Sequence, residues 1–409
     1  MNNRLIKSQV SYWRVTALLV LVVVLTVTST RQQADTGICD GGAAVTIPFT
    51  DVPSGNIFFC SIAAAYFEGL TNGTTPTTYS PAAPVQREQM AAFVTRTLDQ
   101  SLRRGSQQAI LNQWWIPTTF PDHAKSPVGT APYFVAADGA DLWVTNFVDG
   151  TITRVRASDG GIVQTWTGAV NPICLIAAQG AVFVTGNTSP GKLYTLVSAA
   201  CCSNQVAALT TDQLGALPVG IAFDGTYIWT ANQGGSVSRV SNGVPTTISL
   251  GVSSPYGMLY DGTNIWITDR SDNRLKELDS NANILASIPV GDDPFHPAFD
   301  GINIWVPNRV SNTVTVVRVK DAAGDSLASP FTLATLSGNG LSDPRCAAFD
   351  GQRILITNFG AESVSLWKAA DLSPLGSVTT GTNTHPVGVC SDGANFWITL
   401  YGFGQLLRF

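Results

Sequence analysis

Five side chains in the C-terminal half of the sequence could carry chemistry together: Asp293, His296, Asp343, Arg345 and His385. Each lies within two residues of a proline, and they include two of the three histidines of the chain. Imidazoles and carboxylates brought together could bind a divalent cation, bind an anionic or polar ligand, or perform acid–base catalysis. They could equally hydrogen-bond loop backbone and water around a polar opening. The elements that position them decide what they can do.

The prolines belong to a phrase that recurs seven times between Ala131 and the C-terminus. The phrase is Pro, a short apolar run, usually Asp-Gly, two residues, an apolar pair often ending in Trp, then Thr and Asn. Its glycines fall at 139, 180, 225, 262, 301, 351 and 393, so the spacings are 41, 45, 37, 39, 50 and 42 residues. A period near 40 residues with short strands and Gly turns is typical of a β-propeller blade. The sequence therefore predicts a mainly β chain with a seven-bladed β-propeller over 131–409.

This architecture places the five candidate residues. The proline lies seven residues before the glycine in six copies and eight before it at Pro172. It is expected to begin the innermost strand of each blade, so its neighbours should lie at one mouth of the central channel. The aspartates, the histidines and Arg345 are then expected to converge at that mouth from blades five, six and seven.

Two other recurring features have a structural interpretation. Trp residues stand four positions after the glycine in five copies, at 143, 229, 266, 305 and 397. They could form a carbohydrate-stacking surface, but each blade needs a large apolar filler, so we predict that they pack between neighbouring blades. The repeated Asp-Gly and Thr-x-Asn positions predict turns rather than catalytic carboxylates.

The seventh copy ends at Phe409, inside its third strand. Its fourth strand must come from elsewhere or leave an open edge. The apolar segment 112–118, within the linker 106–130, is the predicted donor and would close the ring with an N-terminal strand. His123 of the same linker is expected in a surface loop.

Composition narrows the function. Charged residues make up 12% of the chain and the net charge is −5, so no nucleic-acid partner is expected. The sequence contains no P-loop, no Gly-x-Ser-x-Gly elbow and no Cys-x-x-Cys, so phosphate-loop, serine-hydrolase and structural-zinc chemistry have no support. The cysteine count of seven is odd. Cys39 and Cys60 could pair, whereas three cysteines fall on inner strands, where buried thiols are expected: Cys174, Cys346 and Cys390.

The N-terminal residues are typical of an export signal. Arg4, Lys7 and Arg14 precede the apolar run 16–28, which is too short for a full membrane span. We expect a signal peptide over 1–30, with an uncleaved signal anchor as the alternative, followed by a polar spacer over 31–47. Export permits disulfides and predicts a location in the cell envelope, at the cell surface or in the periplasm.

Residues 48–105 differ from everything that follows. Phe49-Thr-Asp51-Val-Pro53 opens the segment, a helical pattern runs over 57–70, Thr-Tyr-Ser-Pro81 follows, and a second helical pattern starts near 85. This order resembles an S-layer homology (SLH) module, a family that attaches exported proteins to cell-wall polymers. The resemblance implies that Arg87 would pair an acidic or pyruvylated sugar. However, the residues flanking Arg87 differ from the family motif, and one module in place of the usual three loses multivalency. A spacer or protein-contact role is the alternative.

The propeller itself carries a second resemblance. Trp143-Val-Thr-Asn146 and Phe183-Val-Thr-Gly-Asn187 are similar to segments of the YVTN, NHL and virginiamycin B lyase-like propellers. This resemblance implies the seven-bladed fold. The lyases use a Glu/His cluster with magnesium, and no inner strand here contains a Glu-x-His pair, so the activity is not carried over.

The sequence thus predicts an exported envelope protein with an SLH-like module and a propeller that binds a protein or small-molecule ligand without catalysis. The alternative is a lyase or hydrolase acting at the channel mouth through His296, His385 and Asp343. A structural surface-layer component is a third interpretation. No cofactor is expected, although a divalent cation bound at the mouth is an alternative. Wall or envelope polysaccharide is the expected partner of Arg87.

Overall fold

The computed structural model describes residues 36–38, 44–56, 58–67, 71, 73–85, 90, 125–196 and 205–409. The chain divides into two compact units, Met1–Leu111 and Asn112–Phe409. Within the described residues, no helix combines the length and the apolar character needed to cross a membrane. The predicted signal 1–30 and the closing segment 112–118 lie outside the described residues, as do Arg87 and His123.

In the first unit, a short hairpin pairs β1 (Thr36–Ile38) with β2 (Ala44–Thr46), and α2 (Phe59–Phe67) falls within the first helix predicted there. Phe49 is fully buried and contacts the rings of Tyr66 and Tyr79. Cys60 is disulfide-bonded, while Cys39, its expected partner, lies outside the described residues. Most of the second predicted helix also falls there, so the structure does not support an α-helical module.

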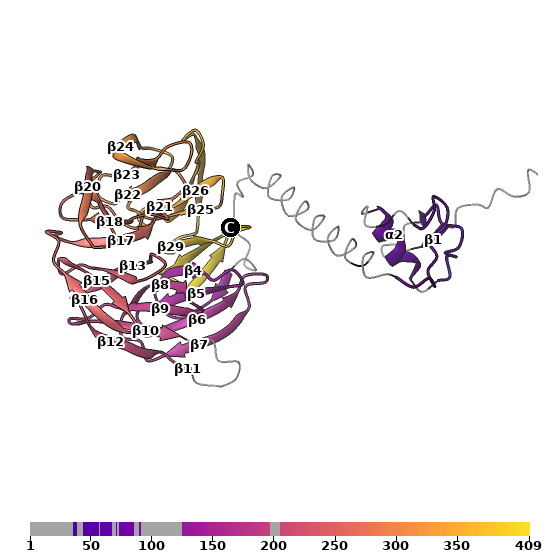
Figure 1. Cartoon of the computed structure of the whole chain (residues 1–409), viewed down its shortest axis with the longest axis horizontal. Coiled ribbons are helices and arrows are strands. Elements are labelled where there is room, and N and C mark those ends of the chain that lie inside the picture. The colour runs from indigo at the N-terminus through magenta and orange to yellow at the C-terminus, as the bar shows by residue number, and fades with distance from the viewer. Residues whose placement is uncertain are drawn as a thin grey trace, which may run out of the picture. The chain divides into compact units, whose positions relative to one another are not determined.

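The second unit is a seven-bladed β-propeller, as the repeats predict (Figure 1). Each blade is an antiparallel sheet of four strands, and blade one gains a fifth, β11 (Gln205–Val206), parallel to its outer strand. The inner strands of blades one to seven are β4 Pro132–Ala137, β8 Pro172–Ala178, β13 Pro218–Phe223, β17 Pro255–Tyr260, β21 Ala298–Phe299, β25 Pro344–Phe349 and β29 Pro386–Ser391. The second strands are β5 Asp141–Asn146, β9 Ala181–Gly186, β14 Ile228–Asn232, β18 Ile265–Asp269, β22 Asn303–Asn308, β26 Arg353–Asn358 and β30 Phe396–Leu400.

The third strands are β6 Thr151–Arg156, β10 Gly191–Leu196, β15 Ser236–Ser241, β19 Arg274–Leu278, β23 Thr313–Lys320, β27 Ser363–Lys368 and β31 Gln405–Arg408. The outer strands are β7 Ile162–Thr167, β12 Ala208–Leu214, β16 Val244–Ile248, β20 Ile284–Pro289, β24 Ser326–Leu336, β28 Pro374–Thr379 and, in blade seven, β3 Lys125–Pro127.

An N-terminal strand closes the ring, but it is not the segment predicted at 112–118. Strand β3 pairs with β31, and the Ser126 hydroxyl donates to the carbonyl of Gly160 at 2.7 Å. Because only four residues separate β3 from the first residue of β4, this strand reaches the open edge of blade seven by a short connection. The same blade therefore contains the C-terminal strand and the first strand of the propeller.

The Trp residues pack between blades, as predicted. All five are at most 2% exposed, and Trp266, for example, contacts Ile304 and Val306 of the next blade. Each indole Nε1 also donates to the aspartate of its own Asp-Gly turn, at 2.6–2.9 Å. The same carboxylates accept two backbone amides of the turn, as Asp261 does from Thr263 and Asn264. These aspartates are turn residues.

Threonine near the end of the second strand links neighbouring blades. The Thr145 hydroxyl accepts the amide of Phe134 in its own blade and donates to the carbonyl of Ile173 in the next, at 2.6 Å. Four further threonines repeat the inter-blade bond: Thr185, Thr268, Thr357 and Thr399. The Thr-x-Asn positions are therefore structural, and they draw the inner strands close around the axis.

Candidate ligand-binding site

Two sets of equivalent residues surround one mouth of the central channel. The residue before each inner-strand proline accepts, through its carbonyl, the amide of the first residue after the second strand. The first set is Ala131, Asn171, Leu217, Ser254, Asp293, Asp343 and His385, and all but Ser254 have a positive φ. The second set is Phe147, Asn187, Gln233, Arg270, Arg309, Phe359 and Tyr401. Aspartate and arginine occupy these sets only in blades four to six, and a histidine occupies the first set in blade seven.

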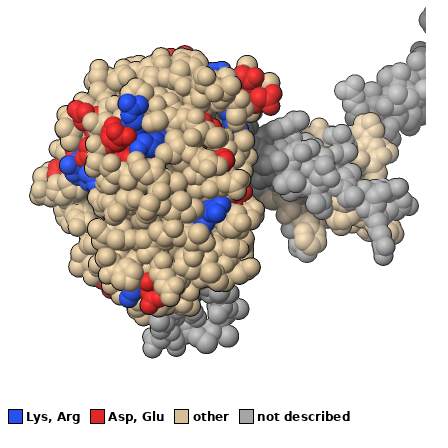
Figure 2. Space-filling model, turned by 60° about the vertical axis from the view of Figure 1, so that its left-hand side comes forward, with Lys and Arg blue, Asp and Glu red and all other residues tan. Residues whose placement is uncertain are grey.

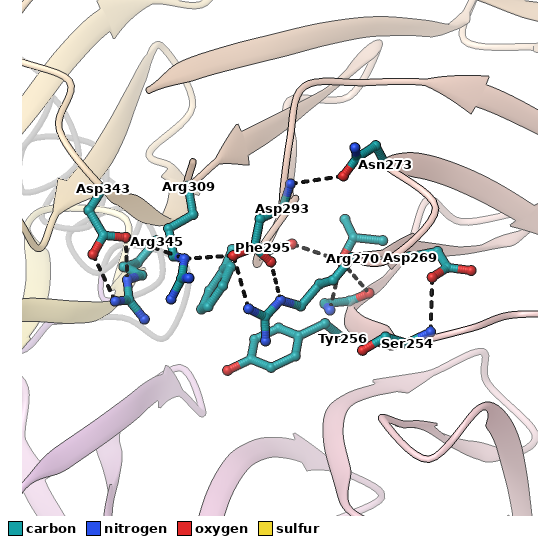
Figure 3. Close-up of polar contacts among 12 residues, drawn as sticks. Ser254, Tyr256, Asp269, Arg270, Asn273, Asp293, Phe295, Arg309, Asp343 and Arg345 are labelled. Carbon is teal, nitrogen blue, oxygen red and sulfur yellow. Dashed lines mark hydrogen bonds and ion pairs between the residues drawn. The ribbon is translucent and has the colours of Figure 1, made fainter. Parts of the chain in front are cut away.

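Three arginines and two aspartates form one network across blades four, five and six (Figure 3). Arg270 forms a two-bond ion pair with Asp293, with one of the two contacts, Nη2 to Oδ2, at 2.9 Å. Arg309 reaches the same carboxylate through Nε at 2.6 Å and lies 3.9 Å from Asp343. Arg345 pairs with Asp343 at 2.8 Å. The five groups carry a net charge of +1 at the mouth.

Aromatic rings lie against all three guanidinium groups, closely for Arg270 and Arg345 and at 5.8 Å from the Phe295 ring centre for Arg309. Arg270 lies over both Tyr256 and Phe295, with its Cζ 4.6 Å from each ring centre. Arg345 lies over Phe295 at 4.9 Å and over Phe359 at 4.3 Å. Stacking a planar guanidinium on a ring stabilises the cation and fixes its plane. Both arginines are well buried, with 19% and 14% of their side chains exposed.

Arg309 differs from its two neighbours. It is 35% exposed and lies between the two aspartates. Its Nε is paired, whereas the structure gives its two terminal Nη atoms no hydrogen-bond partner among the described residues. Those N–H groups are thus available to a ligand in the opening.

His385 lies at the edge of the network. Its ring stacks on Phe359, with 4.6 Å between ring centres and 19° between planes. Its Nδ1 is buried without a hydrogen bond and lies 3.7 Å from Glu362 Oε1. The side chain is 37% exposed. His385 therefore extends the mouth into blade seven but does not contact the aspartates.

His296 is not part of the opening. It is 4% exposed and lies against the rings of Phe134 and Tyr256, with Nε2 3.8 Å from the Cys174 sulfur. Burial, together with the nearby positive charges of Arg270 and Arg345, lowers the pKa of His296 to about 3. The ring is therefore neutral near pH 7, within the channel rather than at its mouth.

His296 belongs to a plug that fills the channel. The residue two positions after the inner-strand proline is Gly220, Gly257 or Gly388 in three blades. A Cβ at these glycines would lie 2.3–2.6 Å from a carbonyl oxygen of the neighbouring blade. The other four blades place Phe134, Cys174, His296 and Cys346 there. Of the three inner-strand cysteines predicted to be buried, Cys174 and Cys346 are buried, whereas Cys390 is only half-buried. Burial raises the pKa of Cys346 to about 12 and also raises that of Cys174.

Below Tyr256, a buried ion pair supports the mouth. In blade four, Asp269 replaces the asparagine that ends most second strands, and it pairs with Lys276 at 2.8 Å. Burial acts to raise the pKa of Asp269, but hydrogen bonds from Lys276 and two backbone amides outweigh it and lower the pKa. Those amides belong to Ser253 and Ser254, so the pair fixes the loop that leads into Tyr256.

The structure therefore brings together three of the five residues singled out in the sequence: Asp293, Asp343 and Arg345. His385 lies beside them and His296 beneath them. Sequence reasoning missed Arg270 and Arg309, although both directly follow the residue that ends a second strand. Within the described part of the chain, no group of three or more His, Cys, Asp or Glu residues is arranged to hold a metal ion.

Comparison with known proteins bears on the fold. Neither a family model nor a curated protein matches the chain. Solved structures do match: a streptogramin B lyase at 17% identity (TM-score 0.57, covering 69% of this chain and 95% of that one) and virginiamycin B lyase from Staphylococcus aureus at 16% (TM-score 0.57, 69% and 97%). In fold, the propeller resembles the virginiamycin B lyases. The WD40 propeller domain of Doa1 is similar at 12% identity (TM-score 0.58, 70% and 95%), so the likeness concerns architecture alone.

Proposed function

We propose that this chain is a non-catalytic binding protein whose propeller holds an anionic group of its ligand at the arginine-lined mouth. The observation that carries the proposal is the position of Arg309, partly exposed between Asp293 and Asp343 with both Nη atoms unpaired. A guanidinium fork of this kind suits the bidentate recognition of a carboxylate or phosphate.

The neighbouring groups support this role for Arg309. Arg270 and Arg345 are held by stacking and ion pairs, so they add positive potential without needing to reorganise when the ligand binds. The buried rings of Tyr256 and Phe295 lie against these guanidinium groups, and the half-buried ring of Phe359 lies beside Arg345. The hydroxyl groups of Tyr133 and Tyr256, 2.6 Å apart, add a polar pair. The ligand best suited to such a site carries a carboxylate or phosphate group.

Thermal unfolding tests the proposal. Phosphate, citrate and glucuronate are added at matched ionic strength, with sodium chloride as reference. At a concentration of about 100 times Kd, a bound anion stabilises the folded state by about 2.7 kcal/mol. We expect at least one anion to raise the Tm of the natural protein and Arg309→Ala to abolish the rise.

Arg156→Ala is the matched control, because Arg156 also pairs with an aspartate but lies on strand β6, away from the mouth. This variant should keep the full response. The proposal fails if no anion acts beyond sodium chloride or if Arg309→Ala responds as the natural protein does.

We further propose that the N-terminal unit attaches the protein to a wall or envelope polysaccharide after export. Support comes from the contact between two separated motifs of the SLH-like pattern. The Asp51 carboxylate accepts the amides of Tyr79 and Ser80 at 2.8 and 2.7 Å. The proposed polymer contact is Arg87.

A pulldown on purified cell-wall and peptidoglycan fractions tests attachment, using residues 31–409, the Arg87→Ala variant and residues 125–409. Loss of binding in both altered forms supports attachment through the N-terminal unit. If the intact protein stays in the supernatant, the attachment proposal fails while the mouth proposal stands.

A lyase or hydrolase is the second candidate, and His385 is the observation that favours it. The ring is accessible and its Nδ1 faces Glu362 at 3.7 Å, an arrangement that could move a proton. Activity on virginiamycin B or quinupristin, with magnesium or with EDTA, should then disappear in His385→Ala while the Tm is unchanged. Absence of turnover by the natural protein under both conditions would leave the non-catalytic function.

A further inference from the structure

A second concavity lies at the other end of the channel, where the inner strands end. It has a volume of about 450 Å³, within the range of roughly 300–1,000 Å³ usual for small-molecule sites. Six inner strands contribute to it, namely β4, β8, β13, β17, β25 and β29. The two residues of the inner strand of blade five, Ala298 and Phe299, are not among the lining residues.

The lining of this cavity is chemically unlike the mouth. None of the described residues that line it carries a charge. Its walls include Ile176, Phe223, Met258 and Phe349. Rings and branched side chains present apolar surface to a ligand, and the unbranched Met258 can adapt to its shape. Tyr260 adds a ring that carries a hydroxyl group.

The plug separates the cavity from the arginine-lined mouth. Phe134 belongs to the lining and also contacts His296 inside the channel. The thiol of Cys174 contacts the other side of that imidazole. Because these side chains fill the axis, a molecule in the cavity does not reach Arg309.

The charge around the cavity selects against anions. Five lining segments run directly into turn aspartates: Asp138, Asp224, Asp261, Asp350 and Asp392. These carboxylates are fixed by backbone amides and four of them also by a tryptophan Nε1. A negatively charged ligand would be repelled by them, whereas an uncharged one would not.

We propose that this cavity binds a compact, uncharged apolar molecule with an aromatic or branched aliphatic body. The proposal is independent of the ligand at the mouth. The propeller then has two sites of opposite character at the two ends of one blocked axis.

Fluorescence titration of the full-length protein with N-phenyl-1-naphthylamine, a neutral apolar probe, tests this. We expect a saturable rise in emission. Ala137→Trp places a large ring in the lining and should weaken binding by about tenfold or more, because the ring occupies the space that the probe needs. Ala140→Trp is the matched control, since Ala140 is exposed and lies outside the lining.

A second variant keeps the test informative if Ala137→Trp does not fold. Ile176→Glu adds a charge to a half-buried position of the lining and should also weaken binding of the probe by about tenfold. Thermal unfolding identifies which variants are folded. The proposal is overturned if the natural protein gives no saturable signal, if folded Ala137→Trp or Ile176→Glu binds as before, or if Ala140→Trp weakens binding equally.

Discussion

At the scale of single residues, one side-chain type has two roles at the mouth. Arg270 and Arg345 are stacked on aromatic rings and paired with aspartates, so their contacts stabilise the folded protein. Arg309 has its shortest ion-pair contact through Nε, and we propose that its outer N–H groups bind a ligand. The difference follows from exposure, which is 35% for Arg309 and below 20% for the other two.

His296 gives a pH prediction at this scale. Its pKa falls from 6.5 to about 3 on folding, first because of burial and then because of Arg270 and Arg345. Below pH 6.5 the unfolded chain takes up a proton that the folded chain does not. The stability contribution is therefore complete above pH 6.5 and is lost as the pH falls toward 3. Each pH unit costs about 1.4 kcal/mol, so about 2 kcal/mol is lost between pH 6.5 and 5.

Urea unfolding of the natural protein and His296→Gln at pH 7 and pH 5 measures this loss. The variant should be less stable at pH 7 but should show a smaller fall at pH 5. His385→Gln is the control, because its ring is exposed at the mouth, and it should retain the loss due to His296. An undiminished fall in His296→Gln would contradict the assignment.

The sequence could predict that Asp293, Asp343 and Arg345 lie at the mouth, because they neighbour a repeated proline. It could not predict their partners, since Arg270 and Arg309 lie in the turns that directly follow β18 and β22, outside the repeated phrase. Nor did it separate His296 from His385. His296 lies two positions after Pro294, inside the channel, whereas His385 directly precedes its proline and lies at the mouth. The position of His296 depends on the backbone between Pro294 and Pro297, where it pairs with Cys346.

At the scale of elements, the blade depends on one repeated contact between the turn and the second strand. The turn aspartate accepts two backbone amides and an indole N–H, so a single carboxylate fixes both the hairpin and the inter-blade Trp. Five blades use this arrangement. In blade six Leu355 replaces Trp, and Arg353 donates to Asp350 instead.

Asp261→Ala tests this contact. The change leaves two amides and the buried Trp266 indole without an acceptor, and we expect a loss of about 3 kcal/mol in the free energy of unfolding. Asp371→Ala removes an exposed turn aspartate that accepts two hydrogen bonds from Ser373, so its effect should be much smaller. Urea unfolding compares the two, and equal losses would contradict the role given to the indole bond.

The element that departs furthest from the repeat is the inner strand of blade five. Pro307 replaces the linking threonine of its second strand, and Pro297 interrupts the inner strand. His296 instead pairs in parallel with Cys346 of blade six. The number and order of blades followed from the periodicity, because each copy carries its own turns. The pairing of His296 with Cys346 could not be predicted from the periodicity, since it depends on a neighbouring blade.

At the scale of the whole molecule, the ring is closed by three residue pairs between β3 and β31. The surface around it is sparsely charged, and on the face in Figure 2 positive and negative groups lie beside one another. Cohesion therefore comes mainly from the apolar contacts between blades and from the closing strand.

Two shortened chains measure the closing strand. Residues 125–409 keep β3, and residues 128–409 lack it and expose the edge of β31. We expect the shorter chain to lose about 2 kcal/mol or more of stability and to self-associate through that edge. Thermal unfolding and size-exclusion chromatography would detect both effects, and identical behaviour of the two chains would contradict them.

The position of β3 also has a mechanical consequence. All residues of the first unit precede β3 in the chain, so a pull on that unit is transmitted along the chain toward β3. Among the described residues, the first propeller contacts along this path are the three pairs with β31, at the point where the ring is joined. If the first unit is tethered and the propeller is dragged by a bound partner, the ring should open at blade seven before any other blade is stretched.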